Sequence, residues 1–489
     1  MEPTAHRLEL PEGPSSSGTR DPANAGSSPV IAWGERQRAN PSVKRAACTP
    51  LNCYVAAAAL LLGCREPAPH SPPPDRTAAT PVVAWSDPWL LEEGRRYLDD
   101  PAHRRRSLEA SLTQHDNSYS RQRLDHYALG ATGWDLLPVW NPVSVPVTDA
   151  PAALLDGVAP LWDGRRPTTV SGWVELGREV FFRYPMREES YLEHALSRPA
   201  LARSVGIIQA PDGSWPGAVR FRDVDGEVKV GLTCALCHTD VKNGALVIGR
   251  ARRSFDYGRM RLAYHADTGA PLDPELARRM RTWGPGRADV TEDRDEDPVS
   301  IPDFWGLREQ QYLTQAGTIR HTGPAALAIR QETQLLHSNH ERVRPPRELA
   351  WALAMYLYSL RAPDRPAGDP ALVTRGARLF NEHCSECHGN AAGGGPLVTA
   401  SRVGTDPALA TGHGRGTGRY RPSALIAVGE AGPYLHDGSV ATLEDLFSAA
   451  RLSPGYRGVN GVGAVPGHLW ATDWSGDDRA ALLAWLRAR

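Results

Sequence analysis

RGARLFNEHCSECHG, residues 375–389, is the stretch that decides the fold of this chain, and its centre is a C-x-x-C-H run made by Cys384, Cys387 and His388. Two thiols at this spacing can form thioethers to the vinyl groups of a haem, and the adjacent histidine then lies under the iron. With 7 Cys and 16 His in 489 residues, chance alone gives such a run about 0.003 times. We therefore expect a covalently attached haem c at this motif.

The chain contains a second run of the same kind, Cys234, Cys237 and His238 in GLTCALCHTD. The alternative is a zinc site, because C-x-x-C also opens many zinc motifs, but structural zinc takes four nitrogen or sulfur ligands. Each run offers only three ligands, and one shared cluster would have six. The two runs together predict two haem c groups, with His238 and His388 as the proximal iron ligands.

Composition narrows the class of protein. A chain of 489 residues has room for two or three domains. Its net charge of -1 argues against electrostatic binding of nucleic acid, so we expect no nucleic-acid partner. The chain has no run of about eighteen apolar residues, so we expect no membrane-spanning helix in the processed protein.

The N-terminal segment predicts export and a lipid anchor. Residues 1–42 are rich in Pro, Ser, Gly and charge, and are either disordered or the product of a start codon assigned too early, with Val43 as the real start. Residues 43–64 then carry a Lys-Arg pair, the apolar run 54–62 (YVAAAALLL) and Cys64, as a signal peptide does. The alternative is a buried apolar helix. The LLGC ending resembles the lipobox of bacterial lipoproteins, which implies lipidation of Cys64 and a place on the periplasmic face, where stray thiols would be oxidised.

The rest of the chain divides by composition and repeats. Residues 65–85 form a Pro-rich linker that cannot pack. Residues 86–168 form an N-terminal extension that we expect to pack as a wrapper on the haem domains. We call residues 169–365, which hold the first motif, the first domain, and residues 366–489 the second domain.

An internal duplication supports two similar domains. Trp173–Phe182 (WVELGREVFF) is an expected helix that matches 371–380 (ALVTRGARLF) ahead of the second motif, and 347–360 (RELAWALAMYLYSL) matches 477–486 (DDRAALLAWL) at the end of each domain. An insertion before the first motif reads as a β-hairpin around Asp225 and the following glycine. The expected fold is mainly α, with two fused domains behind an irregular and helical N-terminal extension.

The stretch PYLHDGSVATLEDLF, residues 433–447, is where a family resemblance appears. It resembles the signature of bacterial di-haem cytochrome c peroxidases and their relatives, which pair two cytochrome c domains. The resemblance covers about 170–489 and is most specific after about residue 370. It implies electron transfer, an oxidoreductase that acts on hydrogen peroxide or dioxygen, and a small cytochrome or copper protein as redox partner. The alternatives are a pure electron carrier with both haems six-coordinate, and an oxygenase that acts with dioxygen.

The second haem departs from that family's pattern. The family usually takes a Met as sixth ligand shortly after the HDG motif, but the corresponding segment Leu446–Leu452 has no Met, and all five Met precede Cys384. His468 stands where cytochrome c loops deliver their distal ligand, and di-haem rubber oxygenases are similar in using a His there. His436 in the HDG motif is the rival, with a structural or inter-haem role as its usual one. We therefore predict His468 as the distal ligand of the second haem.

Several residues are candidates for the distal ligand of the first haem. The peroxidase family implies a His soon after the attachment motif, for which His265 is the nearest candidate. The internal repeat favours His337 or His340 instead, and Met260 and Met280 are further candidates. An open site would suit peroxide or oxygen chemistry, whereas a filled site would suit electron transfer.

Two further features have a functional and a structural interpretation. Residues 291–297 (TEDRDED), together with Asp289, could bind a calcium ion of the kind that such peroxidases hold, or form a solvated loop. Trp305 could bridge the two haems, or be one of the many tryptophans of the core.

Overall fold

The computed structural model describes residues 85–126, 137–147, 155–289, 296–365, 367–459 and 463–489. The predicted signal peptide with Cys64, the stretch before it and nearly all of the linker lie outside the described residues. Those that are described belong to one unit, Ala78–Arg489. Within them, no helix combines the length and apolarity that crossing a membrane requires.

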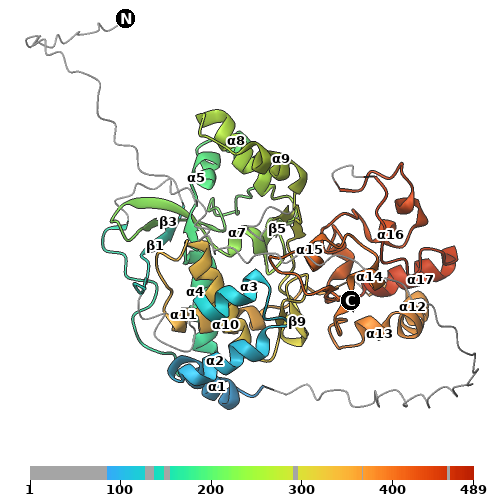
Figure 1. Ribbon diagram of the computed structural model, residues 1–489, viewed down its shortest axis with the longest axis horizontal. Coiled ribbons are helices and arrows are strands. Elements are labelled where there is room, and N and C mark those ends of the chain that lie inside the picture. The colour runs from blue at the N-terminus through green and yellow to red at the C-terminus, as the bar shows by residue number, and fades with distance from the viewer. Residues whose placement is uncertain (1–84, 127–136, 148–154, 290–295, 366, 460–462) are drawn as a thin grey trace, which may run out of the picture. The chain divides into compact units, whose positions relative to one another are not determined.

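Two helix pairs, one in each domain, form the framework of the fold (Figure 1). In the first domain α4 (Val170–Arg183) packs against α11 (Arg347–Ser359). In the second domain α12 (Pro370–His383) packs in the same way against α17 (Gly476–Arg487). These are the helices that the internal repeat predicts at the start and end of each domain, and their existence is confirmed.

Each helix pair crosses at a glycine. A Cβ added to Gly177 in α4 would lie 1.9 Å from the carbonyl oxygen of Ala352 in α11, and a Cβ on Gly376 in α12 would lie 2.1 Å from that of Ala481 in α17. Both distances are far below van der Waals contact, so only glycine allows the backbones to approach this closely. The two domains therefore share one packing geometry, as expected of a duplication.

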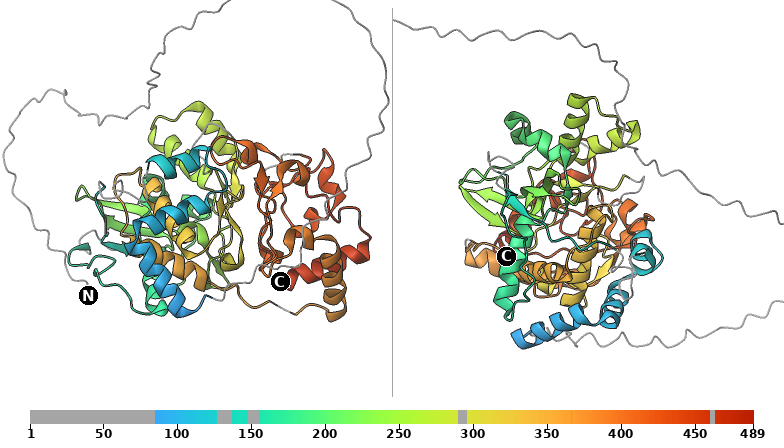
Figure 2. Two further views of the ribbon diagram at one scale, coloured as in Figure 1. Left: turned by 60° about the horizontal axis from the view of Figure 1, so that its bottom comes forward. Right: turned by 90° about the vertical axis from the view of Figure 1, so that its left-hand side faces the viewer.

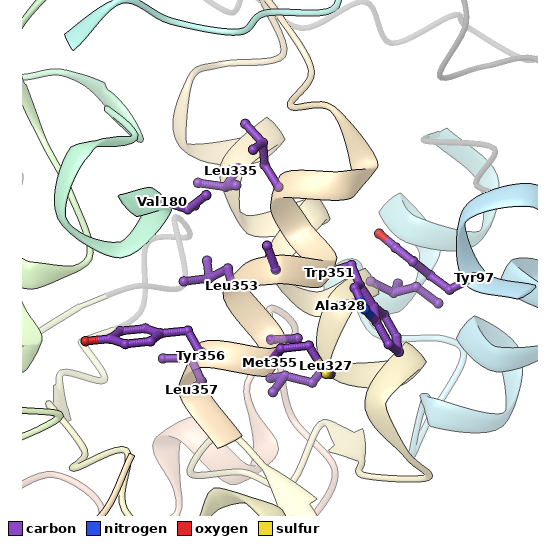
Figure 3. Packing of buried hydrophobic residues seen from close by; sticks show 14 of the residues in the cluster. Tyr97, Val180, Leu327, Ala328, Leu335, Trp351, Leu353, Met355, Tyr356 and Leu357 are labelled. Carbon is purple, nitrogen blue, oxygen red and sulfur yellow. The ribbon is translucent and has the colours of Figure 1, made fainter. Parts of the chain in front are cut away.

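The first domain has its largest apolar core around α10 (Pro324–Ser338) and α11. Figure 3 shows side chains of both helices, among them Leu327 and Trp351, packed together with Val180 of α4. α11 is apolar nearly all round its circumference because neighbours cover every face of it. The first domain also contains α5 (Ser190–Leu196), α6 (Pro199–Ser204), α7 (Ala235–His238), α8 (Tyr257–Thr268), α9 (Pro274–Trp283), η4 (Leu307–Glu309) and strands β5 (Thr239–Lys242), β6 (Ala245–Ile248), β7 (Arg287–Ala288), β8 (Val299–Ser300), β9 (Tyr312–Leu313) and β10 (Ile319–Arg320).

The inserted hairpin is present as predicted and appears in green in Figure 2. Its strands β3 (Ala218–Arg222) and β4 (Val228–Leu232) pair antiparallel around the five-residue connection that contains Gly226. The outer strands β1 (Ser144–Pro146) and β2 (Arg187–Glu188) complete a four-stranded sheet in the order β1-β3-β4-β2. This sheet ends immediately before the first C-x-x-C-H motif and so fixes where that motif begins.

The N-terminal extension packs on the first domain through α1 (Asp87–Asp99) and α2 (Pro101–Ser111). Tyr97 of α1 stacks on Trp351 with ring centroids 5.7 Å apart (Figure 3), and its hydroxyl donates to Glu332 at 2.6 Å. Two short elements, α3 (Ser118–Arg121) and η1 (Gln122–His126), follow. The buried contact of Tyr97 accounts for how this extension is held on α10 and α11.

The second domain is smaller, and between α12 and α17 it consists mostly of loops with a few one-turn helices (orange to red in Figures 1 and 2). Its core joins residues of both long helices, among them Phe380 and Leu482. The other elements are α13 (Ser385–His388), α14 (Ala400–Val403), α15 (Ala408–Thr411), α16 (Leu443–Leu446), η5 (Val428–Glu430), η6 (Ala449–Leu452) and the paired strands β11 (Val398–Thr399) and β12 (Arg419–Tyr420). The prediction of a mainly helical fold is confirmed.

Candidate functional site

The two C-x-x-C-H motifs adopt the same local structure. Each first cysteine, Cys234 or Cys384, is the N-cap of a one-turn helix, α7 or α13, and the histidine is its last residue. On a helical turn, residues three apart lie on the same face, so the two thiols of each motif can reach one edge of a haem. All four cysteines are free of disulfides.

Both motif histidines use Nδ1 to hold a backbone carbonyl. Nδ1 of His238 is 3.1 Å from the carbonyl oxygen of Pro302, and Nδ1 of His388 is 2.5 Å from that of Gly393. A carbonyl only accepts, so Nδ1 carries the proton and Nε2 keeps the lone pair that binds a metal. Burial lowers the pKa of His238 to about 3 and also lowers that of His388. Both rings are therefore neutral and oriented as iron ligands.

A cavity of about 260 Å³ lies against the second motif. Both thiols and the imidazole of the motif line it, together with His436, His468 and Arg421. Apolar side chains of the second core form much of the remaining wall: Phe380, Leu425, Leu443, Leu446, Phe447 and Leu482. A mostly apolar cavity with histidines at its wall is the environment that a haem requires.

His468 contributes to this cavity from a loop with an unusual backbone. Its φ is 45°, in the left-handed region, and its N–H donates to the carbonyl oxygen of Val403 at 2.7 Å. Its Nδ1 is buried and has no hydrogen-bond partner among the residues that the structure describes. Burial first, and then the nearby charges of His388 and Arg451, lower its pKa to about 4. The ring is thus a neutral imidazole at the same cavity as His388.

Arg451 holds the His468 loop in place, and sequence reasoning missed it. This fully buried guanidinium donates to the carbonyl oxygens of Val465 at 2.5 Å, Gly467 at 2.6 Å and His468 at 2.8 Å. It also donates to Leu446 at 3.1 Å. Arg451 lies in the segment where the peroxidase family would carry its Met ligand. The available signal was a single charged residue in the otherwise uncharged run LFSAARL.

His436 has different surroundings from His468. Its ring stacks on Tyr420 with centroids 4.2 Å apart, and the Tyr420 hydroxyl lies 3.2 Å from its Nε2. Its backbone carbonyl accepts a hydrogen bond from Ser300 of the first domain at 2.9 Å. His436 therefore joins the two domains through its backbone, while its ring is held by a neighbouring tyrosine.

The first motif has a tighter environment. The ring of Phe304 stacks on His238 with centroids 3.8 Å apart, and Sγ of Cys234 lies 3.9 Å from Sδ of Met186. Met186 is a sulfur at this site that the sequence analysis did not consider. Nothing in its sequence context distinguished it from the other methionines, because it becomes a neighbour of the motif only through the pairing of β2 with β4.

The three histidine candidates for the first distal position occupy two different places. His265 lies in α8, with Nδ1 3.1 Å from the carbonyl oxygen of Ala270 and Nε2 buried without a partner. His337 and His340 lie together at the end of α10, where His340 has a left-handed backbone with φ of 58°. His265 has the hydrogen-bond pattern of a metal ligand, but the choice among the three stays open.

The guanidiniums of Arg330 and Arg421, which lie beside the first and the second site, have no carboxylate partner among the described residues. Arg330 in α10 lies close enough to Cys234 and His238 to affect both electrostatically, and its side chain hydrogen-bonds only the amide of Gln331. Arg421 lines the second cavity and donates to the carbonyl oxygen of Thr314 and to Gln310. A cation in an apolar site is stabilised by a counter-charge. The carboxylates of a haem propionate would supply it at each site, so both sites fit the group that the motifs imply.

The segment 302–305 belongs to both sites. The carbonyl of Pro302 holds His238 and Phe304 stacks on that ring, while Pro302, Asp303 and Trp305 line the second cavity. Trp305 is buried and donates from its indole nitrogen to the carbonyl oxygen of Ile248 at 3.0 Å. The two candidate haem sites are therefore separated by one shared wall, with Trp305 in it.

The described residues of the acidic segment 289–297 do not form an assembled metal site. Residues 290–295 lie outside the described part of the chain, and Glu296 pairs with Arg278 at 2.8 Å. Asp289 lies 3.7 Å from Arg279. Among the described residues, no three His, Cys, Asp or Glu side chains gather as a metal cluster. The calcium site stays a prediction, and the four motif cysteines do not come together as a shared zinc site would require.

Comparison with known proteins supports the assignment of the second domain. Residues 373–488 match the family model for cytochrome c. That domain is therefore a c-type cytochrome domain, which supports covalent haem and electron transfer. No curated protein matches the chain.

Two solved structures resemble it distantly. A Kuenenia stuttgartiensis hydrazine synthase structure is 16% identical, with 43% of this chain and 78% of that chain covered and a TM-score of 0.28. A MauG-like protein associated with microbial copper homeostasis is also 16% identical, with 73% and 94% covered and a TM-score of 0.32.

Proposed function

We propose that this chain is a di-haem c-type cytochrome that acts as a redox enzyme of the di-haem cytochrome c peroxidase type. One observation carries the proposal: the wall formed by 302–305 touches the proximal histidine of the first site and lines the cavity of the second. Reducing a peroxide to water consumes two electrons. Two one-electron centres on either side of one thin wall can deliver both electrons to a single substrate molecule.

The chain's own residues have separate roles in this proposal. When bound, haem c supplies an iron that cycles between the ferrous and ferric states. His238 and His388 hold the irons from the proximal side, with their orientation fixed by Pro302 and Gly393. Trp305 excludes water from the wall between the sites and provides an aromatic ring on the path between them.

A pure electron carrier is the second candidate, and a specific observation favours it. His468 lines the same cavity as His388 and is clamped by Arg451, which suits a filled, six-coordinate second haem. If the first haem is filled as well, neither iron can bind a substrate. The two candidates therefore differ only at the distal side of the first haem.

The test is to mix the fully reduced holoprotein with hydrogen peroxide and follow both haems by absorption. The proposal predicts that one peroxide oxidises both haems, and that a reduced small cytochrome or copper protein then sustains turnover. Oxidation no faster than that of an isolated six-coordinate cytochrome would favour the carrier. Consumption of dioxygen without peroxide would favour an oxygenase instead.

We also propose that the mature chain is anchored by lipid at Cys64 on the periplasmic face of a bacterial membrane. The support is the signal-like run before Cys64 and the need of haem c for attachment outside the cytoplasm. The chain expressed from Val43 should enter the membrane fraction and incorporate labelled palmitate, and Cys64→Ser should do neither. Equal labelling of both would contradict the anchor.

A further inference from the structure

A buried tyrosine and a half-buried histidine form a short hydrogen bond close to the second cavity. The hydroxyl of Tyr358 in α11 lies 2.5 Å from Nε2 of His321, and Nδ1 of His321 lies 2.8 Å from the carbonyl oxygen of Gln310. The carbonyl only accepts, so Nδ1 carries the proton of the neutral ring and Nε2 accepts from the Tyr358 hydroxyl. The direction of this hydrogen bond is thus fixed by the backbone.

Burial shapes the proton chemistry of this pair. It lowers the pKa of His321 to about 4, so the imidazole is neutral at ordinary pH, and it raises the pKa of Tyr358 well above its usual value. Tyr358 therefore does not lose its proton alone. If it loses an electron, however, its hydroxyl becomes strongly acidic, and Nε2 of His321 is in position to take the proton.

An aromatic path leads from this pair to the surface. The ring of Trp85 lies 5.1 Å from that of Tyr358 and 6.1 Å from that of His321. Trp89 stacks on Trp85 at 5.9 Å, with its side chain 38% exposed. Electron transfer slows steeply with distance, so closely spaced rings divide one long step into short ones.

The other end of the path meets the second haem site. Gln310, whose carbonyl holds His321, lines the second cavity, and its side-chain oxygen accepts a hydrogen bond from Arg421. One residue therefore separates the imidazole from the cavity. The path runs from the cavity through Gln310 to the tyrosine and histidine pair, and then through Trp85 to Trp89.

We propose that Tyr358 and His321 form a proton-coupled redox relay between the second haem site and the exposed Trp89, where an external one-electron donor can reach the chain. One electron leaves Tyr358 for the oxidised haem, and the hydroxyl proton moves to Nε2 of His321, which leaves a neutral tyrosyl radical beside an imidazolium. One electron from the donor then returns through Trp89 and Trp85, and the proton returns to oxygen. The oxidant is the oxidising equivalent that a peroxide delivers to the haem. In this respect only, the relay rests on the proposed function.

Arg308 decides which ring of the path holds the missing electron. Its guanidinium carbon lies 4.8 Å over the ring of Trp85, and it also donates to the Trp85 carbonyl. A cation on the ring face stabilises the neutral indole and opposes a radical cation there. The radical therefore rests on Tyr358, where the proton can leave, and passes through Trp85 only transiently.

The test is photo-oxidation of the ferric holoprotein with a ruthenium polypyridyl flash-quench reagent, followed by electron paramagnetic resonance. This oxidant is external, so the result does not depend on the reaction with peroxide. We expect a neutral tyrosyl signal that narrows when the protein carries ring-deuterated tyrosine, and that decays more slowly in heavy water. Tyr358→Phe should abolish it, and His321→Leu should abolish the isotope effect and most of the signal.

The matched control is Tyr356→Phe, because Tyr356 is buried two residues earlier on the same helix and its hydroxyl has no histidine partner in the described part of the chain. It should leave the signal unchanged. An undiminished signal in Tyr358→Phe, or no tyrosyl signal in the unsubstituted protein, would overturn the relay. Haem content and the ferric spectrum report whether each variant is folded. If Tyr358→Phe does not fold, His321→Leu still tests the relay. A signal with the ruthenium reagent but none with peroxide would keep the relay and contradict the proposed function.

Discussion

The two domains share the framework around their C-x-x-C-H motifs and differ on the side where a distal haem ligand would lie. In both, a helix pair crosses at a glycine, and the motif histidine donates from Nδ1 to a backbone carbonyl. In the second domain a clamped loop brings His468 to the cavity of His388. In the first domain no single distal residue stands out among His265, His337 and His340.

This difference indicates which part of a duplicated domain can change. The crossing glycines are constrained by backbone atoms at about half of contact distance, so neither domain tolerates a side chain there. The distal loop is held by hydrogen bonds from one arginine to several carbonyls, an arrangement that one copy can acquire without disturbing the other. Substitutions in each domain in turn test this difference.

The largest effect should follow from removing the thiols of one motif at a time. The double variant Cys234→Ala/Cys237→Ala should keep one covalent haem of two, and so should Cys384→Ala/Cys387→Ala, because thioethers need the thiols. Pyridine haemochrome analysis per chain measures this directly. A single haem in the unsubstituted protein would show that the domains are not equivalent even in attachment.

Substitution of either crossing glycine should lower the stability of the protein by almost the same amount. Gly177→Ala and Gly376→Ala each force a Cβ against a backbone oxygen, and overpacking of this kind costs roughly 1–3 kcal/mol or more. Thermal unfolding of each variant gives the loss. Gly476→Ala is the control, because a Cβ there meets nothing within 4 Å. A near-neutral Gly376→Ala would show that the second helix pair does not pack as closely as the first.

Replacement of the clamp should affect only the second haem. Arg451→Met leaves several buried carbonyls without a donor, which costs about 3 kcal/mol and releases the strained loop of His468. We expect part of the second haem to become high-spin while the first is unchanged. Arg457→Met is the control, since among the described residues that exposed arginine donates only to the nearby carbonyls of Pro454 and Tyr456. Equal spectra for both variants would mean that His468 is held without the clamp.

The smallest effect concerns the ionic contact between the domains. Glu430 of the second domain pairs with Lys242 and Arg250 of the first, and also with Arg365. The hydrogen bond from Lys242, with the charges of Arg365 and Arg250, lowers its pKa from 4.5 to about 2. Because folding lowers this carboxyl pKa, the contact stabilises the folded state at pH values above the ordinary pKa. This contribution is lost as pH falls from about 4.5 towards 2.

The measurement is the unfolding free energy of the unsubstituted protein and Glu430→Gln across this pH window. The carboxylate is partly exposed, so solvent screening limits the difference to below about 1 kcal/mol. The difference should be present at pH 6 and vanish at low pH. A difference that grows as pH falls would have the wrong sign for this contact.

Sequence alone could predict the attachment sites and the paired helices, because both depend on local spacing. The C-x-x-C-H runs, the entry and closing helices and the hairpin near Gly226 are read from neighbours in the chain. The N-cap of α17 was predictable for the same reason, since Ser475 accepts from the N–H of Asp478 three residues on. These features need no knowledge of distant contacts.

The rest depends on residues far apart in sequence. Arg451 reaches carbonyls that are 14 to 17 positions away, and Tyr358 meets His321 across 37 positions. Neither pair has a spacing that a motif could reveal. The wall at 302–305 was likewise noticed only as one tryptophan, because its link to His238 passes through a backbone carbonyl that carries no sequence signature.

We propose that the two haem sites differ at a distal histidine, His468, which Arg451 clamps in the second domain. The ferric absorption spectra of His468→Ala and His436→Ala test this directly. In His468→Ala the second haem should become high-spin and gain the ability to bind cyanide, or carbon monoxide when reduced, while the first haem keeps its spectrum. His436→Ala should leave the spin state of the second iron as it was, because Tyr420 holds that ring. An unchanged low-spin spectrum in His468→Ala together with a high-spin one in His436→Ala would contradict the account.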